Sequence, residues 1–347
     1  MKKRKSLLFM LSCLGMLPLC GCGSTGESSP AAATAASGAA PAPEIVPDQI
    51  GVLADARMNF QGISRLYTYY VPSTYKPGDK LPLMITLHGR AFNAKQQLAD
   101  SKFHELAGRE GFIVIAPNCV TIDNDGNAVS EGLTFRDLPG VSPLNIRWNV
   151  GYPLHNSHEI NDVAYISTLI DCFAERFGID TSRVYLSGMS NGGLMSMKLA
   201  TELGNKIAGV GSVGGAIWYQ HMKNGISTPM KIVMIHGDQD PTSPINGVEN
   251  FSPSIWEAAD WFNEQFGVTD KAVVTELPQT VEGDETQVVK YEWPEKNGSQ
   301  VVVYEVKGGG HTWPCGTQYF PEERIGKLSK HYSASELIWN ELKNFHK

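Results

Sequence analysis

Short runs of apolar, often β-branched residues alternate along the chain with longer segments whose apolar residues recur at helical spacing. The short runs predict strands at residues 66–71, 83–87, 112–116, 183–186, 209–213, 232–235 and 301–306. The longer segments predict helices at about 94–110, 158–177, 193–203, 255–266 and 334–346. This alternation predicts an α/β fold, with a mainly parallel central sheet and helices on both of its faces.

Turn and cap residues add detail to this picture. Asn297 and Gly298 are expected to form the turn of a hairpin that joins residues 287–293 to the strand at 301–306. Ser333 and Glu336 have the spacing of a capping box at the start of that helix. Residues 121–156 show no strong period, and a long irregular insert of this kind is often a lid or a binding loop. We therefore expect this insert to border the functional site.

The N-terminal segment differs in composition from the rest of the chain. Residues 1–22 carry the basic run Lys-Lys-Arg-Lys and then an apolar core too short for a typical membrane span, which predicts a signal peptide. Residues 23–48 are rich in Ala, Ser and Pro and have almost no large apolar group, which predicts a disordered linker. Residues 49–347 are long enough for one large α/β catalytic domain with a full core.

A cysteine at the end of the signal region indicates lipidation. Cys22 follows a glycine and lies three residues after a leucine, a pattern that resembles a bacterial lipobox. The protein would then be exported as a lipoprotein of the bacterial cell envelope, with the outer membrane as one expected location, and would contact the membrane through its lipid anchor. Cys20 fits the pattern less well, and an ordinary secretory signal cut slightly later would give a secreted protein instead.

Charge and metal-ligand spacing exclude some classes of partner. The formal net charge of −7 argues against a nucleic-acid partner and against an anionic polymer as substrate. His155 and His158 are three residues apart, but no third ligand follows at a suitable spacing, so no metal site is expected. The cysteines outside the signal region allow either one disulfide and one free thiol or no disulfide: Cys119, Cys172 and Cys315.

The segment at residues 183–193, Arg-Val-Tyr-Leu-Ser-Gly-Met-Ser-Asn-Gly-Gly, predicts a strand, a G-x-S-x-G turn and a helix. This is the context of a nucleophile elbow, in which the central Ser190 is held above the sheet at a helix N-terminus. The flanking glycines leave room for a sharp turn beside a strained serine. The alternative is a glycine-rich turn with a solvent-facing serine.

Candidate partners of Ser190 follow it along the chain in the order Asp, His. Asp238 and Asp240 lie in the loop after a buried strand, and position alone does not separate them, because one of them could cap the turn. His311 follows another strand and three glycines, which would let it approach Ser190 as the general base. His236, at the end of the first of these strands, is interpreted as structural.

Backbone N–H groups are expected to form an oxyanion hole. One donor would come from Asn191, the residue after the nucleophile, and the other from Gly89 or Arg90, in the loop after the strand at 83–87. Three tryptophans are candidate walls of the substrate site, with ordinary packing as the alternative for each: Trp148, Trp313 and Trp218.

Several stretches together resemble the secreted polyhydroxybutyrate depolymerase and feruloyl esterase group of α/β-hydrolases, part of carbohydrate esterase family one. The matching stretches span roughly residues 60–345 and are Leu87–Gly89, Asn161–Ile166, Arg183–Gly193, His236–Asp240, Gly308–Pro314 and Ser333–Trp339. The resemblance implies the α/β-hydrolase fold and favours Asp240 over Asp238 as the acid of the triad. The chain departs from the family after Trp313-Pro314, where the family usually has glycine and this chain has Cys315.

These features predict an exported serine carboxylic ester hydrolase that forms an acyl-enzyme and needs no cofactor. The resemblance implies feruloyl or acetyl esters of plant cell-wall polysaccharide, or short-chain hydroxyalkanoate polyesters, as substrates. Because no binding module follows the last helix, we expect soluble aryl or acyl esters and oligomers rather than a crystalline polymer. Two alternatives remain: a serine peptidase of the same fold, and a tethered surface lipoprotein that binds a ligand without catalysis.

Overall fold

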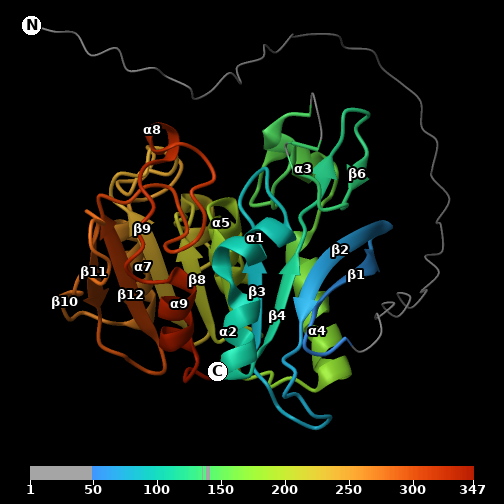
Figure 1. Cartoon of the computed structure of the whole chain (residues 1–347), viewed down its shortest axis with the longest axis horizontal. Coiled ribbons are helices and arrows are strands. Elements are labelled where there is room, and N and C mark those ends of the chain that lie inside the picture. Colours follow the sequence, from blue (N-terminus) through green and yellow to red (C-terminus); the bar gives the residue numbers. More distant parts are fainter. Residues whose placement is uncertain (1–48, 135, 138–140) are drawn as a thin grey trace, which may run out of the picture. The chain divides into compact units, whose positions relative to one another are not determined.

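In the described part of the chain, ten strands form one sheet in the order β1-β2-β4-β3-β7-β8-β9-β12-β11-β10 (Figure 1). This computed structural model describes residues 49–134, 136–137 and 141–347. The strands of the sheet are β1 (Leu53–Phe60), β2 (Ile63–Tyr70), β3 (Leu83–Leu87), β4 (Ile113–Pro117), β7 (Val184–Met189), β8 (Gly209–Val213), β9 (Lys231–Gly237), β10 (Val273–Glu276), β11 (Gln287–Glu292) and β12 (Gln300–Lys307). A separate small sheet pairs β5 (Thr121–Ile122) with β6 (Ala128–Val129).

The middle of the large sheet is parallel. The strands from β4 to β12 in the sheet order pair in parallel, whereas β1, β2, β11 and β10 are added in antiparallel pairs at the two edges. Every residue of β3, β4, β7, β8 and β9 is buried, which explains why their sequences are nearly continuous apolar runs. The prediction of an α/β fold with a mainly parallel sheet is confirmed.

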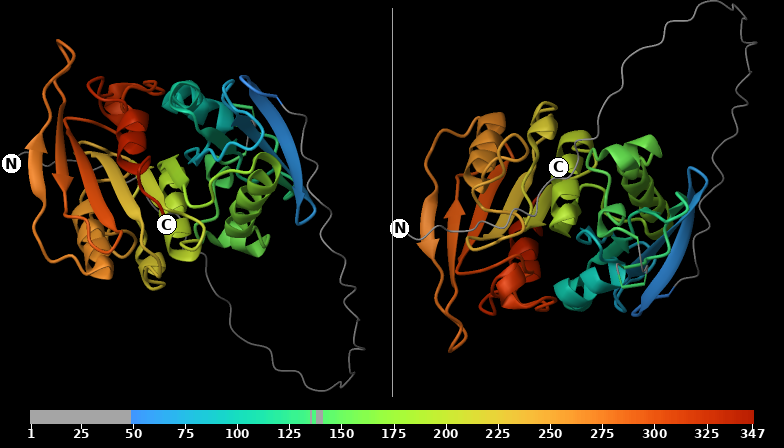
Figure 2. Two further views of the ribbon diagram at one scale, coloured as in Figure 1. Left: turned by 90° about the horizontal axis from the view of Figure 1, so that it is seen from below. Right: turned by 90° about the horizontal axis from the view of Figure 1, so that it is seen from above.

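Helices cover both faces of the sheet, as predicted. They are α1 (Ala94–Ser101), α2 (Phe103–Glu110), α3 (Pro153–Ser157), α4 (Asp162–Phe177), α5 (Asn191–Glu202), α6 (Tyr219–Met222), α7 (Ile255–Phe266), α8 (Glu322–Ile325) and α9 (Ala334–Leu342), with a 3-10 turn at Pro143–Asn145. Leu83 and Ile85 of β3 pack into the core formed with α4, α5 and α7, while Met84 between them packs with α1, α2 and α9. Figure 2 shows α1, α2 and α9 on one side of the sheet and α4, α5 and α7 on the other.

Left-handed backbone conformations decide two element boundaries. The predicted helix at 94–110 is two helices, because Lys102 has a φ of 52° and its N–H donates to the carbonyl of Leu98 at 2.8 Å, which ends α1. The predicted hairpin forms between β11 and β12. Asn297 and Gly298 have φ values of 53° and 72° in the turn between them, as two-residue hairpin turns require.

The capping box predicted at the start of α9 does not form. The side chain of Ser333 caps no backbone N–H there, and Glu336 instead accepts a hydrogen bond from Arg109 of α2 at 2.7 Å. A capping box is present at α7, where Ser254 Oγ accepts the N–H of Glu257 at 3.1 Å and Glu257 returns the interaction at 2.8 Å. A contact with a distant helix therefore replaced the local interaction that the spacing predicted.

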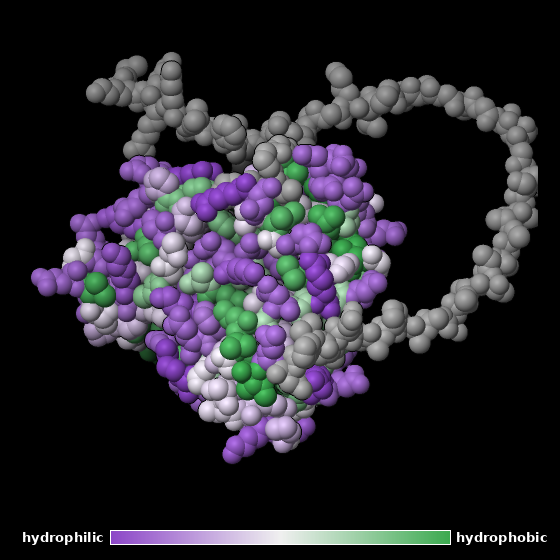
Figure 3. Space-filling model, turned by 45° about the vertical axis from the view of Figure 1, so that its right-hand side comes forward, coloured by the Kyte–Doolittle hydropathy of each residue, from purple (hydrophilic) through white to green (hydrophobic). Residues whose placement is uncertain are grey.

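Two edge strands escaped the sequence analysis. All residues of β10 are exposed, and β1 alternates between buried and exposed positions, so neither shows the continuous apolar run of the central strands. Most of the exposed large hydrophobic residues of the described chain lie on or beside these edges: Ile50, Val52, Leu53, Val273 and Val274. On the face drawn in Figure 3, hydrophilic residues cover most of the surface and hydrophobic residues form small groups between them.

Predictions about the first 48 residues lie outside the described part of the chain. They concern the signal peptide at 1–22, lipidation of Cys22 and the linker at 23–48. Among the helices of the described residues, none combines the length and the apolar character that crossing a membrane requires.

Candidate active site

Ser190 lies in the turn between β7 and α5, at the end of the sheet where the parallel strands finish. Its φ of 54° and ψ of −116° are costly for a residue with a side chain. The Ser190 N–H donates to the carbonyl of Val213 at 2.8 Å, and its carbonyl accepts the N–H of Leu194 at 2.8 Å. The neighbouring strand β8 and the first turn of α5 thus hold the serine in this strained conformation, at the N-terminus of a helix.

The glycines on either side of Ser190 are required by space. A Cβ on Gly188 would lie 2.3 Å from the carbonyl carbon of Gly192. A Cβ on Gly192 would lie 2.1 Å from the carbonyl oxygen of Leu87 in β3. The turn can therefore be this tight only where both positions lack a side chain, which is the physical basis of the G-x-S-x-G pattern here.

His311 and Asp240 form a buried, charge-assisted hydrogen bond. Nδ1 of His311 donates to Oδ2 of Asp240 at 2.6 Å, and only 4% and 5% of the surfaces of the two residues are exposed. The two residues meet because β9 and β12 are parallel neighbours, so the loops that leave their carboxyl ends lie side by side. With Nδ1 as the donor, Nε2 of His311 remains as a proton acceptor, and His311 lines the same pocket as Ser190.

The structure gives separate contacts to Asp240, the candidate triad acid, and to the residues around it. Oδ1 of Asp240 accepts two backbone N–H groups from the turn that follows it, at 2.7 and 2.8 Å. Asp238 accepts the N–H of Gly308 at 2.7 Å and so ties its own loop to the loop after β12. His236 donates through Nε2 to the carbonyl of Ser243 at 2.7 Å, which is a structural role. Burial lowers the pKa of His236.

The expected oxyanion donors surround Ser190. Asn191 is the first residue of α5, where a backbone N–H has no helical acceptor. A Cβ on Gly89 would lie 3.6 Å from the Cβ of Ser190, so this loop approaches the nucleophile closely. The carbonyl of Gly89 accepts a hydrogen bond from Nδ1 of His88 at 2.8 Å. Because the C=O and N–H of a trans peptide point in opposite directions, this bond also fixes the direction of the Arg90 N–H.

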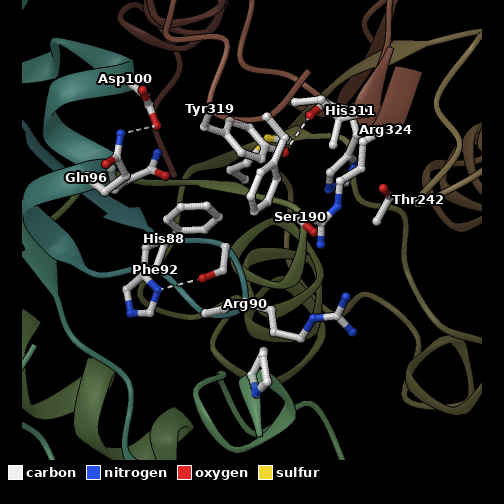
Figure 4. A pocket seen from close by; sticks show the side chains of 17 residues that line it. His88, Arg90, Phe92, Gln96, Asp100, Ser190, Thr242, His311, Tyr319 and Arg324 are labelled. Atoms are coloured by element: carbon white, nitrogen blue, oxygen red, sulfur yellow. Dashed lines mark hydrogen bonds between the residues drawn. The ribbon is translucent and has the colours of Figure 1, made fainter. Parts of the chain in front are cut away.

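A pocket of about 210 Å³ opens at Ser190 and His311 (Figure 4). Its walls come mainly from the β3–α1 loop, from α1 and from the segment around α8. Sequence analysis did not predict these wall residues: Phe92, Gln96, Gln97, Asp100, Tyr319, Phe320 and Arg324. One usable signal was the spacing of Gln96 and Asp100, four residues apart on a helix after the oxyanion loop, where they form a hydrogen bond of 3.1 Å.

Known proteins resemble this chain in part of its sequence and in its fold. Residues 155–270 match the family model of phospholipases and carboxylesterases. The structure of an acetyl xylan esterase from Aspergillus awamori is similar with a TM-score of 0.50 at 15% sequence identity, over 76% of this chain and 94% of that one. The chain has the α/β-hydrolase fold.

Two sequence relatives of this chain carry esterase names. The chain is 26% identical over 254 residues to the bifunctional acetylxylan esterase/xylanase XynS20E of Neocallimastix patriciarum. The aligned segment covers 73% of this chain and 31% of that protein. The chain is 24% identical over 269 residues to NocK of Nocardia uniformis subsp. tsuyamanensis, which is named as a putative esterase, over 74% of this chain and 72% of that protein. The chain therefore spans less than a third of the length of the first relative.

The structure does not bring the three candidate wall tryptophans to the lining of the pocket. Trp148 is fully buried, and its indole N–H donates to a backbone carbonyl of the β3–α1 loop at 3.0 Å. The indole N–H of Trp313 donates to Ser335 at 3.2 Å. The ring of Trp218 packs against Phe251, with centroids 4.2 Å apart. Packing of a large ring, in two cases with a partner for its N–H, explains these positions, so the expectation that they form walls is corrected.

The irregular region 121–156 borders the pocket only in part. It contains the small sheet of β5 and β6, the 3-10 turn at Pro143–Asn145 and the start of α3. Pro143 lines the pocket. Other residues of this region contribute indirectly: the backbone N–H of Trp148 donates to the Asn191 side chain, and the carbonyl of Ile146 accepts the N–H of Ala91 in the β3–α1 loop. The described residues of this region support the oxyanion loops rather than covering them.

The remaining candidates lie apart from the catalytic residues. His155 is buried, and burial lowers its pKa to about 4, while Nδ1 of His158 donates to the carbonyl of Leu154 at 2.8 Å. Within the described ranges, no group of three or more His, Cys, Asp or Glu residues could hold a metal ion. The described cysteines are free thiols: Cys119, Cys172 and Cys315.

Proposed function

We propose that this protein hydrolyses carboxylic esters through an acyl-enzyme formed on Ser190. The observation that carries the proposal is the combination of a strained serine with a paired histidine in one pocket. Ser190 has a φ of 54°, and His311 shares the pocket with it while its Nδ1 is held 2.6 Å from Asp240. A serine that served only as part of a turn would not need this backbone strain beside an oriented base.

Each step follows from a group already placed in the site. Ser190 Oγ attacks the ester carbonyl while Nε2 of His311 takes its proton. Asp240 keeps the imidazole in the correct tautomer and stabilises the imidazolium. The N–H of Asn191 and that of the β3–α1 loop hold the oxyanion, and each such donor typically contributes about 3 kcal/mol to the barrier reduction. His311 then protonates the leaving alcohol, and water, activated by the same base, releases the acid.

The size of the pocket favours a small acyl group. Its volume of about 210 Å³ is below the roughly 300 Å³ at which pockets for drug-sized ligands begin. One relative is named as a bifunctional acetylxylan esterase/xylanase. We therefore favour acetyl esters of plant cell-wall polysaccharide, such as acetylated xylan, over feruloyl esters and hydroxyalkanoate polyesters.

A substrate panel with the purified protein tests this proposal. The panel holds acetylated xylan, para-nitrophenyl acetate and butyrate, methyl ferulate and amorphous polyhydroxybutyrate, each measured beside Ser190→Ala. We expect release of acetate that falls by at least about 10⁴-fold in Ser190→Ala. Ferulate release or polyester clearing without acetate release would reject the acetyl assignment but keep the esterase one. No turnover, together with no labelling of Ser190 by a phosphonate probe, would reject the esterase.

The role of Asp240 has its own matched control. Asp240→Asn should lower kcat by about 10⁴-fold, because the asparagine no longer orients and stabilises the charged imidazole. Asp238→Asn should affect stability rather than kcat, since Asp238 contacts a backbone N–H and not His311. A collapse of turnover in Asp238→Asn alone would show that the acid has been assigned to the wrong aspartate.

We also propose that the enzyme is exported and anchored at Cys22. The support is the lipobox-like pattern after a basic and apolar segment, in residues outside the described structure. Growth of an expressing bacterium with labelled palmitate should label the wild-type chain and not Cys22→Ser. Labelling that persists in Cys22→Ser would contradict an anchor at this residue.

A further inference from the structure

Two arginines line the pocket of Ser190 without a carboxylate partner. Arg90 follows the oxyanion glycine, and Arg324 belongs to α8. In the described residues neither guanidinium forms an ion pair, although both contribute to the lining of the same pocket. In Figure 4, Arg324 lies above Ser190 and Arg90 lies below it. Two exposed arginines thus line the same pocket as Ser190.

The segment that carries Arg324 is fixed to the catalytic histidine. The N–H of His311 donates to the carbonyl of Ile325 at 2.5 Å. The hydroxyl of Tyr319 donates to the carbonyl of His311 at 2.6 Å. The guanidinium carbon of Arg324 lies 4.0 Å from the centroid of the Phe320 ring, which directs the side chain. Arg324 is therefore placed relative to His311 by contacts on both sides of its own position.

Backbone hydrogen bonds fix the main chain on both sides of Arg90. Its neighbour Ala91 donates its N–H to the carbonyl of Ile146 at 2.8 Å, and the preceding carbonyl of Gly89 accepts from His88. Burial and the negative charges of Asp240 and Asp100 raise the pKa of Tyr319, and the positive charges of Arg324 and Arg90 act against that rise. The charges of the two arginines are thus felt by one side chain inside the pocket.

Two acidic groups, Asp240 and Asp100, lie in or beside the pocket. Asp240 accepts hydrogen bonds from His311 and from two backbone N–H groups. Oδ2 of Asp100, which lines the pocket, accepts a hydrogen bond from Gln96 at 3.1 Å, whereas its Oδ1 is buried without a hydrogen-bond partner among the described residues, and burial raises the pKa of its carboxyl group. Neither acid is paired with a guanidinium. The overall net charge of −7 disfavours a polyanion as substrate, but it does not cancel this local pair of positive charges.

The geometry points to a substrate that carries a carboxylate close to the scissile ester. This inference rests on the proposed esterase function and narrows its substrate class. A guanidinium binds a carboxylate in a planar, bidentate arrangement, and such hydrogen bonds are stronger than neutral ones. The carboxylate belongs either to the acyl half, as in the monoester of a dicarboxylic acid, or to the alcohol half, as in a uronic acid that is acylated on one of its hydroxyl groups and keeps its free carboxylate.

The test compares charged and neutral esters of similar size. For the acyl half, para-nitrophenyl hemisuccinate is compared with para-nitrophenyl butyrate. For the alcohol half, an acetylated methyl glucuronoside is compared with the acetylated methyl glucoside. In each pair, the quantity measured is the ratio of kcat/KM for the charged ester to kcat/KM for the neutral ester, so a general loss of activity does not affect the result.

The variant is Arg90→Gln/Arg324→Gln, and Arg57→Gln/Arg109→Gln is its matched control. Arg57 and Arg109 are exposed, lie outside the lining of the pocket and pair with Glu131 and Glu336, so the control removes the same charge elsewhere. We expect the pocket variant to lower the ratio about tenfold or more in at least one substrate pair, mainly through KM. The control should keep it within about twofold. Added salt should lower the wild-type ratio, because it screens the charge.

Each outcome decides the inference. A loss of the ratio in the first or the second pair supports it and assigns the carboxylate to the acyl or the alcohol half. A ratio unchanged by Arg90→Gln/Arg324→Gln in both pairs overturns it. If the wild type turns over no ester at all, the proposed function has failed, and calorimetry with succinate and glucuronate decides the anion site. Binding by the wild type that the pocket variant loses would support the site, and no binding by the wild type would overturn it.

Discussion

The backbone N–H of Trp148 donates to the side-chain Oδ1 of Asn191 at 2.7 Å, and Asn191 Nδ2 lies 3.4 Å from the carbonyl of Trp148. The indole N–H of the same tryptophan donates to the carbonyl of His88 at 3.0 Å. That carbonyl belongs to the trans peptide whose N–H is on Gly89, so the bond fixes the direction of that N–H. Trp148 thus connects the two segments expected to supply the oxyanion hole.

Trp148→Phe should lower kcat more than it raises KM. The substitution keeps an aromatic ring in the core but removes the donor that holds the His88 carbonyl, so the Gly89 N–H loses its fixed direction. Because an oxyanion donor acts mainly in the transition state, we expect kcat to fall by about tenfold or more. Steady-state kinetics with para-nitrophenyl acetate at saturating and low concentrations separates the two parameters.

Trp313→Phe is the matched control for this variant. Trp313 is also buried and also donates its indole N–H, to Ser335 at 3.2 Å, but it lies outside the pocket. We expect a lower melting temperature in both variants and the large loss of kcat only in Trp148→Phe. An equal loss of kcat in the two variants would show that loosening of the core, and not the oxyanion loop, is responsible.

Alanine substitutions at two glycines near Ser190 should have different consequences, one for the stability of the fold and the other for kcat/KM. In Gly192→Ala the new Cβ would meet the carbonyl oxygen of Leu87 at 2.1 Å, so we expect a loss of about 3 kcal/mol or more in the free energy of unfolding. In Gly89→Ala the new Cβ would lie 3.6 Å from the Cβ of Ser190, so the chain should fold but crowd the nucleophile. Urea unfolding and kcat/KM separate the two effects. A stable, active Gly192→Ala would contradict the described turn.

The central sheet was predictable because its strands are buried on both faces. Strands such as β3 and β8 have only buried residues, so their apolar character is visible in the sequence without knowledge of their neighbours. The sequence predicted that His311 pairs with an aspartate, because His311 and the two candidate aspartates all follow the ends of strands. Position alone did not separate Asp238 from Asp240, because the choice depends on which carboxylate accepts the hydrogen bond of His311. The family resemblance favoured Asp240, and in the structure Nδ1 of His311 donates to Asp240.

The walls of the pocket were not predictable by the same reasoning. Tyr319 and Arg324 reach the site through hydrogen bonds of their segment to His311, which join loops that no periodic pattern describes. The tryptophans misled for a related reason. A large aromatic residue near a site can either face the ligand or support the backbone behind it, and only its burial and contacts in the fold distinguish the two.

Asp162→Asn should strongly destabilise the fold. Arg65 and Asp162 form an ion pair at 2.7 Å with side chains that are 1% and 0% exposed, and Asp162 also accepts the N–H of Asn149 at 2.7 Å. Removal of the negative charge leaves a buried, unpaired guanidinium, which typically costs about 3–5 kcal/mol. Asp171 also lies on α4 and forms a partly exposed ion pair with Lys206, so Asp171→Asn is the control. It should lower the free energy of unfolding by about 1 kcal/mol or less. Urea unfolding curves of both variants provide the comparison.

The neutral ring of His88 should make the fold less stable in mild acid. Nε2 of His88 accepts the N–H of Cys119 at 3.1 Å while Nδ1 donates to the carbonyl of Gly89 at 2.8 Å, which requires the neutral imidazole. Burial lowers the pKa of His88 to about 4, whereas the unfolded chain has the ordinary value of about 6.5. Between these values the unfolded chain binds a proton that the folded chain does not, so stability is lost as the pH falls from about 6.5 to about 4.

For a single fully buried histidine, this loss is on the order of 3 kcal/mol across the window. His155 and His221, whose pKa values burial also lowers to about 4, add to it in the same direction. Urea unfolding midpoints at pH 7.5, 6.5, 5.5 and 4.5 measure the wild-type slope, and His88→Gln should reduce that slope by the share of one histidine. Because a glutamine side chain cannot titrate, an identical slope in the two proteins would mean that His88 is protonated in the folded state as readily as in the unfolded one.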